Sequence, residues 1–512
     1  MINQNKCASY RVCASVTLIG VLSMLLTTTV SPAQDEQTSP DVLKFKTLVN
    51  FDGTNGGNPG EFAQATLVQG TDGNLYGTTA SAGAYHSGNL FKMTPDGALT
   101  VLYNFCAQPN CADGGAPGGL VLGIDGNFFG TTSFGGDYGS QFGTPNAGTI
   151  FKITPSGKFT ILHSFCALAN CADGSVPSGL VQGADGNLFG TTQTGGTNQS
   201  QFGGGTIFEI TTEGAFLTLY NFCSQSHCAD GSNPTAAMIQ AGDGNFYGTT
   251  ALGGLYAGGT VFEFAPGGAL TTLYSFCSQP NCTDGAEPRG GLVQAADADF
   301  YGTTLGTVFK ITPSGALTTL YNFCAQTNCA DGSGPYGPLV QAAGGDFYGT
   351  TSLGGANTCQ FLGPVGCGTV FKITPGGALT TLHSFNGTDG EASFSGLVQA
   401  TNGAFYGTTV RGASNNQYCD SGCGTAFALS VGLGPFVEAL PTIGEVGEGV
   451  RILGTDLTRA TSVCFDGRPA EFKVVSPTEI VTRVPAGATT GFVTVTTPSG
   501  ILKSNTRFVV WP

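Results

Sequence analysis

The chain has 512 residues, a formal net charge of −15 and only 10 % charged residues. Because an excess of carboxylates cannot replace the counterions of a phosphate backbone, the composition excludes nucleic acid as a partner. Apolar residues make up 40 % of the chain, enough for a packed core, and 82 glycines favour short elements joined by many turns.

The N-terminus has the pattern of a secretory signal peptide. Basic residues precede an apolar run over 12–26, and small residues follow at Ser31 and Ala33. This pattern predicts that residues 1–33 are removed before Gln34, which leaves an exported chain with no membrane span. A membrane anchor is the alternative, but the run is shorter than the ~20 residues that cross a bilayer.

Residues 34–434 repeat one unit seven times. Its clearest element is an aromatic residue followed by Gly-Thr-Thr, and successive copies are 47 residues apart (Tyr301 to Tyr348) to 60 residues apart (Phe129 to Phe189). Such a period matches a propeller blade better than a solenoid turn of about 20 to 40 residues. The copies begin at Tyr76, Phe129, Phe189, Tyr247, Tyr301, Tyr348 and Tyr406.

Each unit predicts four short strands, which read "GLVQ", "LYGTT", "TVFKIT" and "LTTLYNF" or close variants. All four are rich in β-branched and aromatic residues. The turn "DGN" joins the first two strands and "TPSG" or a variant joins the last two. Both are tight hairpin turns, because Gly supplies a positive φ and Pro presets the turn.

The two ends of the repeat region complement each other. The strand "TLVNF" at 47–51 precedes the first unit, whereas the last unit stops after its third strand near Leu429. If the early strand pairs with the last unit, it completes the seventh blade and closes the ring. We therefore predict an all-β fold, a seven-bladed β-propeller rather than an open β-solenoid, followed by a small immunoglobulin-like β-sandwich over 435–512.

Tight turns fall on one face of such a disk, and the long connections fall on the other, which we call the loop face. The loop face also carries seven close-spaced cysteine pairs, and local pairs of this kind in an exported chain predict disulfides. Each disulfide between cysteines five residues apart closes a ring of about six residues and stabilises the fold by roughly 2 kcal/mol. Zinc needs four converging ligands and redox centres prefer Cys-x-x-Cys, so neither alternative is favoured. Cys464 has no partner nearby in the sequence and is expected to be a buried free thiol. The predicted pairs are Cys106 with Cys111, Cys166 with Cys171, Cys223 with Cys228, Cys277 with Cys282, Cys324 with Cys329, Cys359 with Cys367 and Cys419 with Cys423.

Asp-Gly recurs on the loop face of every unit. These carboxylates could bind calcium or focus a negative potential, but Asp-Gly also caps turns, and no Asp-x-Asp-x-Asp run supports a calcium loop. The only two arginines of residues 34–434 lie on the same face and could hold an anion. The candidate ligand-binding residues are Asp52, Asp113, Asp173, Asp230, Asp284, Asp331, Asp389, Arg289 and Arg411.

Nothing in the chain matches a catalytic motif. His163 and His383 replace the Tyr of "LYNF", which indicates a structural role, and there is no Gly-x-Ser-x-Gly, His-Glu-x-x-His or phosphate loop. We predict no catalytic residue, no metal and no cofactor.

Residues 435–512 have a different composition, with seven acidic and seven basic residues. The strings "VRILGTDL", "VCFDGRPAEF" and "TEIVTRVPAGATTGFVTVTTPSG" resemble the IPT/TIG immunoglobulin-like family. The resemblance implies a spacer or adhesive module with no catalytic residue. The repeats resemble the GloVer tandem-repeat family, which implies an extracellular or surface-associated protein.

These observations together predict a secreted or cell-surface protein without enzymatic activity, which binds a carbohydrate or a protein on the loop face of the propeller. The alternative is an extracellular polysaccharide-degrading hydrolase or lyase that uses loop carboxylates. The fold itself accommodates both functions.

Overall fold

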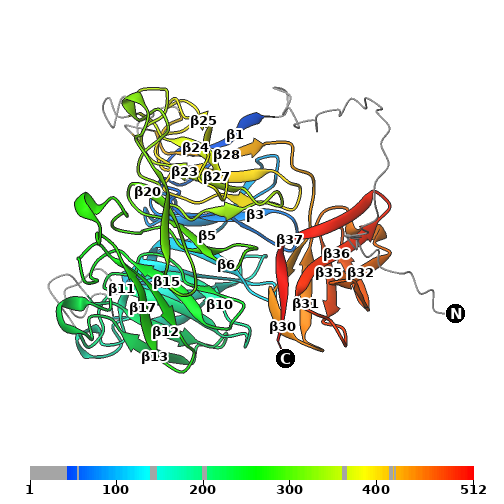
Figure 1. Ribbon diagram of the computed structural model, residues 1–512, viewed down its shortest axis with the longest axis horizontal. Coiled ribbons are helices and arrows are strands. Elements are labelled where there is room, and N and C mark those ends of the chain that lie inside the picture. Colours follow the sequence, from blue (N-terminus) through cyan, green and yellow to red (C-terminus); the bar gives the residue numbers. More distant parts are fainter. Residues whose placement is uncertain are drawn as a thin grey trace, which may run out of the picture.

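The computed structural model describes residues 43–54, 57–138, 147–198, 204–359, 366–413, 419 and 422–511. The predicted signal peptide lies outside these residues. Seven four-stranded antiparallel sheets form the first part of the chain, and two further sheets form the second part. Figure 1 shows the propeller in blue to yellow and the C-terminal domain in orange and red beside it.

Within each blade the strands follow one another from the central channel outward. The innermost strands are β2 (Val68–Gln69), β6 (Gly115–Leu122), β10 (Ser175–Gln182), β14 (Ile239–Gln240), β18 (Val293–Gln294), β22 (Val340–Gln341) and β26 (Val398–Gln399). The second strands are β3 (Leu75–Thr79), β7 (Phe128–Phe134), β11 (Leu188–Thr194), β15 (Phe246–Thr250), β19 (Phe300–Thr303), β23 (Phe347–Thr351) and β27 (Phe405–Thr409).

The outer half of each blade is equally regular. The third strands are β4 (Asn89–Met93), β8 (Thr149–Ile153), β12 (Thr206–Ile210), β16 (Thr260–Phe264), β20 (Thr307–Ile311), β24 (Thr369–Ile373) and β28 (Thr425–Ser430). The outermost strands are β5 (Leu99–Asn104), β9 (Phe159–Ser164), β13 (Phe216–Asn221), β17 (Leu270–Ser275), β21 (Leu317–Asn322), β25 (Leu379–Ser384) and β1 (Lys44–Asn50).

The ring closes through β1, as predicted. This strand pairs antiparallel with β28, from Lys44 opposite Ser430 to Asn50 opposite Thr425, and completes the seventh blade. β1 and β28 lie side by side in Figure 1 although they come from opposite ends of the propeller sequence. The prediction of seven blades is confirmed.

The Gly-Thr-Thr motif has a packing reason. A Cβ on the glycine of the fourth blade, Gly248, would lie 2.5 Å from the ring of Phe262, the phenylalanine of the third strand. The second threonine hydrogen-bonds across to the third strand, as between Thr132 Oγ1 and Thr149 Oγ1 at 2.9 Å. The glycine therefore admits the ring, and the threonine fixes the register of the strands around it.

The C-terminal domain is a sandwich of two sheets. One sheet contains β29 (Glu438–Leu440), β31 (Gly449–Leu453), β35 (Glu479–Arg483) and β34 (Phe472–Ser476). The other contains β30 (Ile443–Glu445), β37 (Gly500–Trp511), β36 (Gly491–Thr497), β32 (Ser462–Phe465) and β33 (Arg468–Ala470), and a 3₁₀ turn, η6, spans Leu457–Arg459. Both sheets contribute to one core that includes Ile452, Ile480, Val493 and Phe508.

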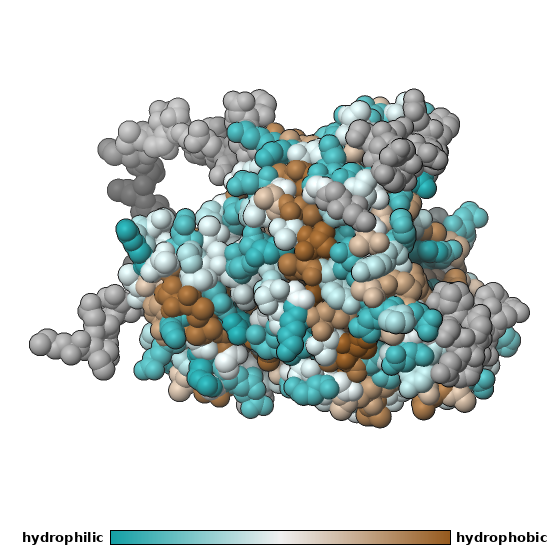
Figure 2. All heavy atoms as spheres, turned by 180° about the vertical axis from the view of Figure 1, so that it is seen from behind, coloured by the Kyte–Doolittle hydropathy of each residue, from teal (hydrophilic) through white to brown (hydrophobic). Residues whose placement is uncertain are grey.

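The surface carries few large exposed apolar side chains, of which Leu255 at 74 % and Tyr256 at 55 % exposure lie in a loop of the fourth blade. On the face seen in Figure 2, apolar residues gather in separate groups among hydrophilic ones. The described residues contain no helix with the length and hydrophobicity that a membrane crossing requires.

Candidate functional site

The predicted cysteine pairs are disulfide-bonded. Five of them close the loops that contain the short 3₁₀ turns η1 (Pro109–Cys111), η2 (Ala169–Cys171), η3 (Ser226–Cys228), η4 (Pro280–Cys282) and η5 (Thr327–Cys329). These loops lead from the outermost strand of one blade to the innermost strand of the next.

The other two pairs lie in the long loops between the second and third strands of the sixth and seventh blades. Cys359 is bonded to Cys367, and Cys419 is bonded to Cys423. Both pairs belong to loops predicted for the loop face, but Cys367 and Cys423 are fully buried and belong to hydrophobic clusters between blades. Each lies two residues before its third strand, where the chain already enters the blade, so these cysteines extend the core and present no surface to a ligand.

The cysteine of the C-terminal domain corrects one prediction. Cys464 is buried but is disulfide-bonded, so the prediction of a free thiol is wrong.

The aspartates that follow the cysteine loops point inward. Asp113 is fully buried, and it accepts hydrogen bonds from Tyr103 Oη at 2.8 Å, from Ala107 N at 2.9 Å and from Gln108 N at 3.1 Å. The Asp113 carboxylate thus accepts its hydrogen bonds from its own cysteine loop and the adjoining strand, which favours the turn-capping interpretation over a ligand site. Four other aspartates are at most 3 % exposed and accept a hydrogen bond from a backbone N–H of their own cysteine loop. They are Asp173, Asp230, Asp284 and Asp331.

The electrostatics of these loops agree with that role. Burial raises the pKa of Tyr321 to about 12, and the hydrogen bond from its hydroxyl to Asp331 adds to the rise. Burial opposes ionisation of Asp284, but hydrogen bonds from Tyr274 and Ser278 outweigh it, so the pKa of Asp284 lies below its usual value. An ionised carboxylate and a neutral phenol therefore form one stable pair.

The two histidines of the "LYNF" position take the place of this phenol. His163 Nε2 lies 3.2 Å from Asp173 Oδ2, and His383 Nε2 lies 3.0 Å from Asp389 Oδ2. Asp52 accepts hydrogen bonds from Thr54 and from Asn58 N within its own loop. None of the seven predicted aspartates lines the cavity described next.

A cavity of about 590 Å³ opens where the innermost strands begin, at the loop-face mouth of the central channel. Residues from all seven blades line it. One position of the repeat varies around this cavity. It lies three residues before the Leu or Met that starts each "LVQ"-like string, and five of the seven blades each have a different residue there. The five side chains there are Gln64, Thr235, Arg289, Tyr336 and Phe394, and all of them line the cavity.

Three of these side chains form one group. The Arg289 guanidinium lies 5.9 Å from the centre of the Tyr336 ring, and the Tyr336 and Phe394 rings are 4.9 Å apart. Arg289 Nη2 also pairs with Glu287 Oε2 at 2.8 Å, so a carboxylate lies beside its positive charge. The mouth therefore presents an aromatic surface edged by a guanidinium and by amide side chains.

The first threonine of each Gly-Thr-Thr holds this mouth in shape. Its hydroxyl donates to a carbonyl of the next blade, close to the variable position, at 2.6–3.4 Å. Thr408 of the last blade reaches Ala63 of the first, so these bonds run around the whole ring. The donors are Thr78, Thr131, Thr191, Thr249, Thr303, Thr350 and Thr408.

Arg411, the other predicted arginine, is not part of the mouth. Its backbone pairs with that of Glu391, and its charge acts on the carboxyl groups of Glu391 and Glu61. Burial nevertheless raises the pKa of both glutamates above the usual value. The two candidate arginines, Arg289 and Arg411, therefore belong to different surroundings.

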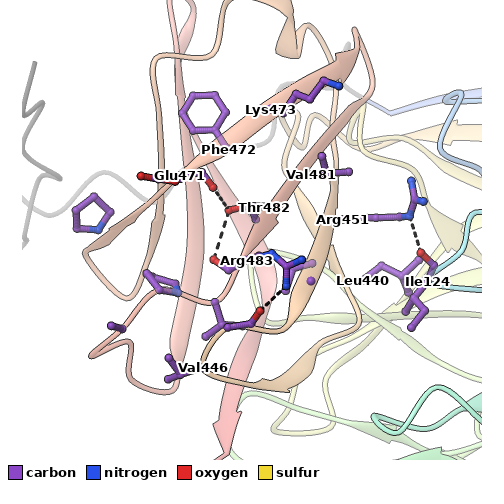
Figure 3. Close-up of a pocket in the computed structure, with 17 residues that line it drawn as sticks. Ile124, Leu440, Val446, Arg451, Glu471, Phe472, Lys473, Val481, Thr482 and Arg483 are labelled. Atoms are coloured by element: carbon purple, nitrogen blue, oxygen red, sulfur yellow. Dashed lines mark hydrogen bonds between the residues drawn. The ribbon is translucent and has the colours of Figure 1, made fainter. Parts of the chain in front are cut away.

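The opposite, tight-turn face of the propeller carries the C-terminal domain. Arg451 Nε donates to Ile124 O at 2.6 Å, Thr478 Oγ1 to Thr71 O at 2.7 Å, and Trp511 Nε1 to Gly242 O at 3.3 Å. A groove of about 1010 Å³ runs along the outer face of the β29–β31–β35–β34 sheet next to this contact. Figure 3 shows Arg451 turned toward Ile124 at one end of the groove.

The repeat changes where this domain docks. Elsewhere the Gln of "LVQ" links neighbouring blades, as Gln182 does by accepting from Ile124 N at 2.8 Å. In the second blade Leu122 replaces it and packs in the same core cluster as Leu453, and in the last blade Gln399 accepts instead from Asn505 Nδ2 at 2.7 Å. The second and last blades therefore depart from the common contact of this Gln where they meet the C-terminal domain.

Among the described residues there is no group of three or more His, Cys, Asp or Glu side chains that could hold a metal ion.

Seven four-stranded sheets around a channel, followed by a β domain, define the class as a β-propeller protein. The chain belongs to the Gloeobacter/Verrucomicrobia repeat family, which it matches over residues 37–170, 139–362 and 304–436. Residues 436–510 match the IPT/TIG domain, so both predicted resemblances are confirmed. No curated protein matches the chain.

Solved structures with a similar arrangement of strands include a streptogramin B lyase, at 13 % identity and a TM-score of 0.48, covering 76 % of this chain and 97 % of that one. Another is the extracellular domain assigned to a hybrid two-component system from B. thetaiotaomicron, at 11 % identity and a TM-score of 0.49. That match covers 92 % of this chain but 59 % of the sensor domain, so this chain spans about three fifths of its length. A gluconolactonase from Xanthomonas campestris matches at 12 % identity and a TM-score of 0.38, covering 66 % of this chain and 90 % of that one. These likenesses say nothing about the activity of this chain.

Proposed function

We propose that this protein is a non-enzymatic binding protein, located outside the cytoplasm, which recognises a neutral carbohydrate at the loop-face mouth of its propeller. The single observation that carries the proposal is the set of five different side chains at one otherwise repeated position, all of which line one cavity. A repeated scaffold that carries different side chains around one cavity is a usual construction of a binding surface.

The chemistry of the mouth favours a sugar. A pyranose has an apolar C–H face that fits an aromatic ring, and hydroxyl edges that pair with planar donors and acceptors. Tyr336 and Phe394 supply such rings, while Gln64, Gln193 and Arg289 supply the polar edge. With a net charge of −15, and with Arg289 paired to Glu287, the protein disfavours polyanionic ligands.

Two observations support binding over hydrolysis and a location outside the cytoplasm. Among the described residues that line the mouth there is no Asp, Glu or His, whereas glycoside hydrolysis needs two carboxyl groups beside the scissile bond. The seven disulfides between close-spaced cysteines are typical of a non-cytoplasmic protein.

The test uses the full chain and neutral hexasaccharides such as cellohexaose, xylohexaose and laminarihexaose, first on an array and then by calorimetric titration. Tyr336→Ala and Phe394→Ala should each weaken binding of the selected glycan at least about tenfold, which corresponds to ~1.4 kcal/mol. Tyr256→Ala, which removes an exposed tyrosine away from the mouth, is the matched control and should leave affinity unchanged.

Reducing-end release is measured in parallel on the same glycans. Sustained turnover would replace the binding interpretation by the enzymatic one. If no neutral glycan binds, or if glycan binding survives both mouth substitutions, the proposed site is wrong.

A further inference from the structure

A second cavity, of about 270 Å³, lies at the other end of the innermost strands, between the propeller and the C-terminal domain. The propeller contributes Val121, Val181 and Ile239 from three neighbouring blades, and the C-terminal domain contributes the segment 438–443. Ile239 lines this cavity and the mouth cavity, so the two follow one another along the channel. The C-terminal domain forms the floor of the channel, and we call this lower cavity the floor cavity.

Strand alternation directs Glu438 into the floor cavity. Along this segment Val437 and Ala439 pack in the core of the C-terminal domain, whereas Leu440 packs against the core of the propeller. Because successive side chains point to opposite faces of a strand, Glu438 shares the side of Leu440 and projects toward the propeller. Its side chain lines the cavity and is solvent-exposed there.

The other polar side chains of the floor cavity are already engaged or are weak partners. Gln182 and Gln240 each accept a hydrogen bond from the turn of the preceding blade and donate to their own turn. Among the described residues nothing donates a hydrogen bond to the Glu438 carboxylate. Thr442 adds one hydroxyl to the lining. The floor cavity therefore combines an aliphatic wall with one carboxylate that lacks a partner in the described part of the chain.

We propose that the floor cavity binds a small primary alkylammonium ion, with the ammonium group on the Glu438 carboxylate and the alkyl stem against Val121, Val181 and Ile239. An ammonium ion supplies the charge and the donors that the carboxylate lacks, and the stem matches the aliphatic wall. A metal ion fits poorly, because calcium takes 6–8 oxygen ligands and magnesium about six, whereas one carboxylate lies here. This site is separate from the carbohydrate site and does not depend on it.

The experiment is a calorimetric titration of the full chain with n-butylammonium chloride at pH 7.5, with 1-butanol as the neutral analogue of nearly the same shape. We expect saturable 1:1 binding of butylammonium and at least tenfold weaker binding of butanol. Glu438→Gln should reduce the butylammonium affinity at least tenfold. Glu445→Gln removes an exposed carboxylate of the same domain outside the cavity, and it should bind like wild type.

A second substitution tests the position of the stem. Val181→Phe would fill the cavity and should abolish binding of both probes, while far-UV circular dichroism verifies that the variant is folded. Equal binding of butanol and butylammonium, unchanged affinity in Glu438→Gln, or no saturable binding by wild type would each overturn the proposal. Because glycan binding at the mouth is measured on the same variants, failure at one site is distinguishable from failure at the other.

Discussion

Replacing Phe51 by alanine tests the closure of the ring. Phe51 follows the closing strand β1, is 2 % exposed and packs against Phe91 of the first blade, with ring centres 5.6 Å apart. Its backbone N donates to Gly424 O at 3.0 Å. It thus joins the last blade to the first although it precedes both in the chain.

The chain offers a matched comparison within the ring. Phe276 occupies the same position in the fourth blade, is fully buried and packs against Phe309 of the fifth blade at 5.2 Å. Its backbone N also donates at 3.0 Å, to Gly259 O. The two substitutions therefore delete the same atoms from equivalent surroundings, one at the seam and one inside the ring.

Truncating a fully buried phenylalanine to alanine costs about 3–5 kcal/mol, because transfer and cavity terms add. Urea unfolding followed by far-UV circular dichroism should show that Phe51→Ala and Phe276→Ala each lose this amount, within about 1 kcal/mol of each other. If Phe51→Ala stays within ~0.5 kcal/mol of wild type while Phe276→Ala loses the full amount, β1 does not close the ring.

Four further predictions follow from single contacts. Thr131→Val leaves the Ser178 carbonyl without its 2.6 Å hydrogen bond and should cost ~1–3 kcal/mol in urea unfolding, whereas the exposed Thr160→Val should cost nothing measurable. Non-reducing peptide mapping should recover the close-spaced cysteines as disulfides, and stoichiometric zinc with free thiols would contradict this result. Trp511 is the only tryptophan, and its indole N–H donates to Gly242 O of the propeller. Thr478→Val removes a second hydrogen bond between the two domains and should make the Trp511 fluorescence easier to quench with acrylamide. Unchanged quenching would argue against a rigid contact between the domains. The protein around Glu438 raises its pKa above the usual value, so ionisation of this one carboxyl opposes folding as the pH rises. Without ligand, the stability of Glu438→Gln relative to wild type should therefore increase from pH 4 to pH 8, and a constant difference would contradict the assignment.

The repeated sequence by itself determined the blades and their number. Strand patterns with period two, Gly-containing turns and seven copies leave one economical arrangement, and the unpaired strand at 47–51 fits the unfilled place in the last unit. The local cysteine pairs were equally readable, because a disulfide between residues four to eight positions apart depends only on the loop between them.

Only the tertiary structure decided what the loop-face residues do. Asp113 and its equivalents belong to loops that curl back around them, and this curl directs the carboxylates inward. Gln64 and Phe394 are distant in sequence and meet at one mouth only because the ring closes. The docking of the C-terminal domain on the turn face and the floor cavity depend on contacts between distant segments. Such contacts follow from the packing of whole domains, and no local pattern of residues specifies them.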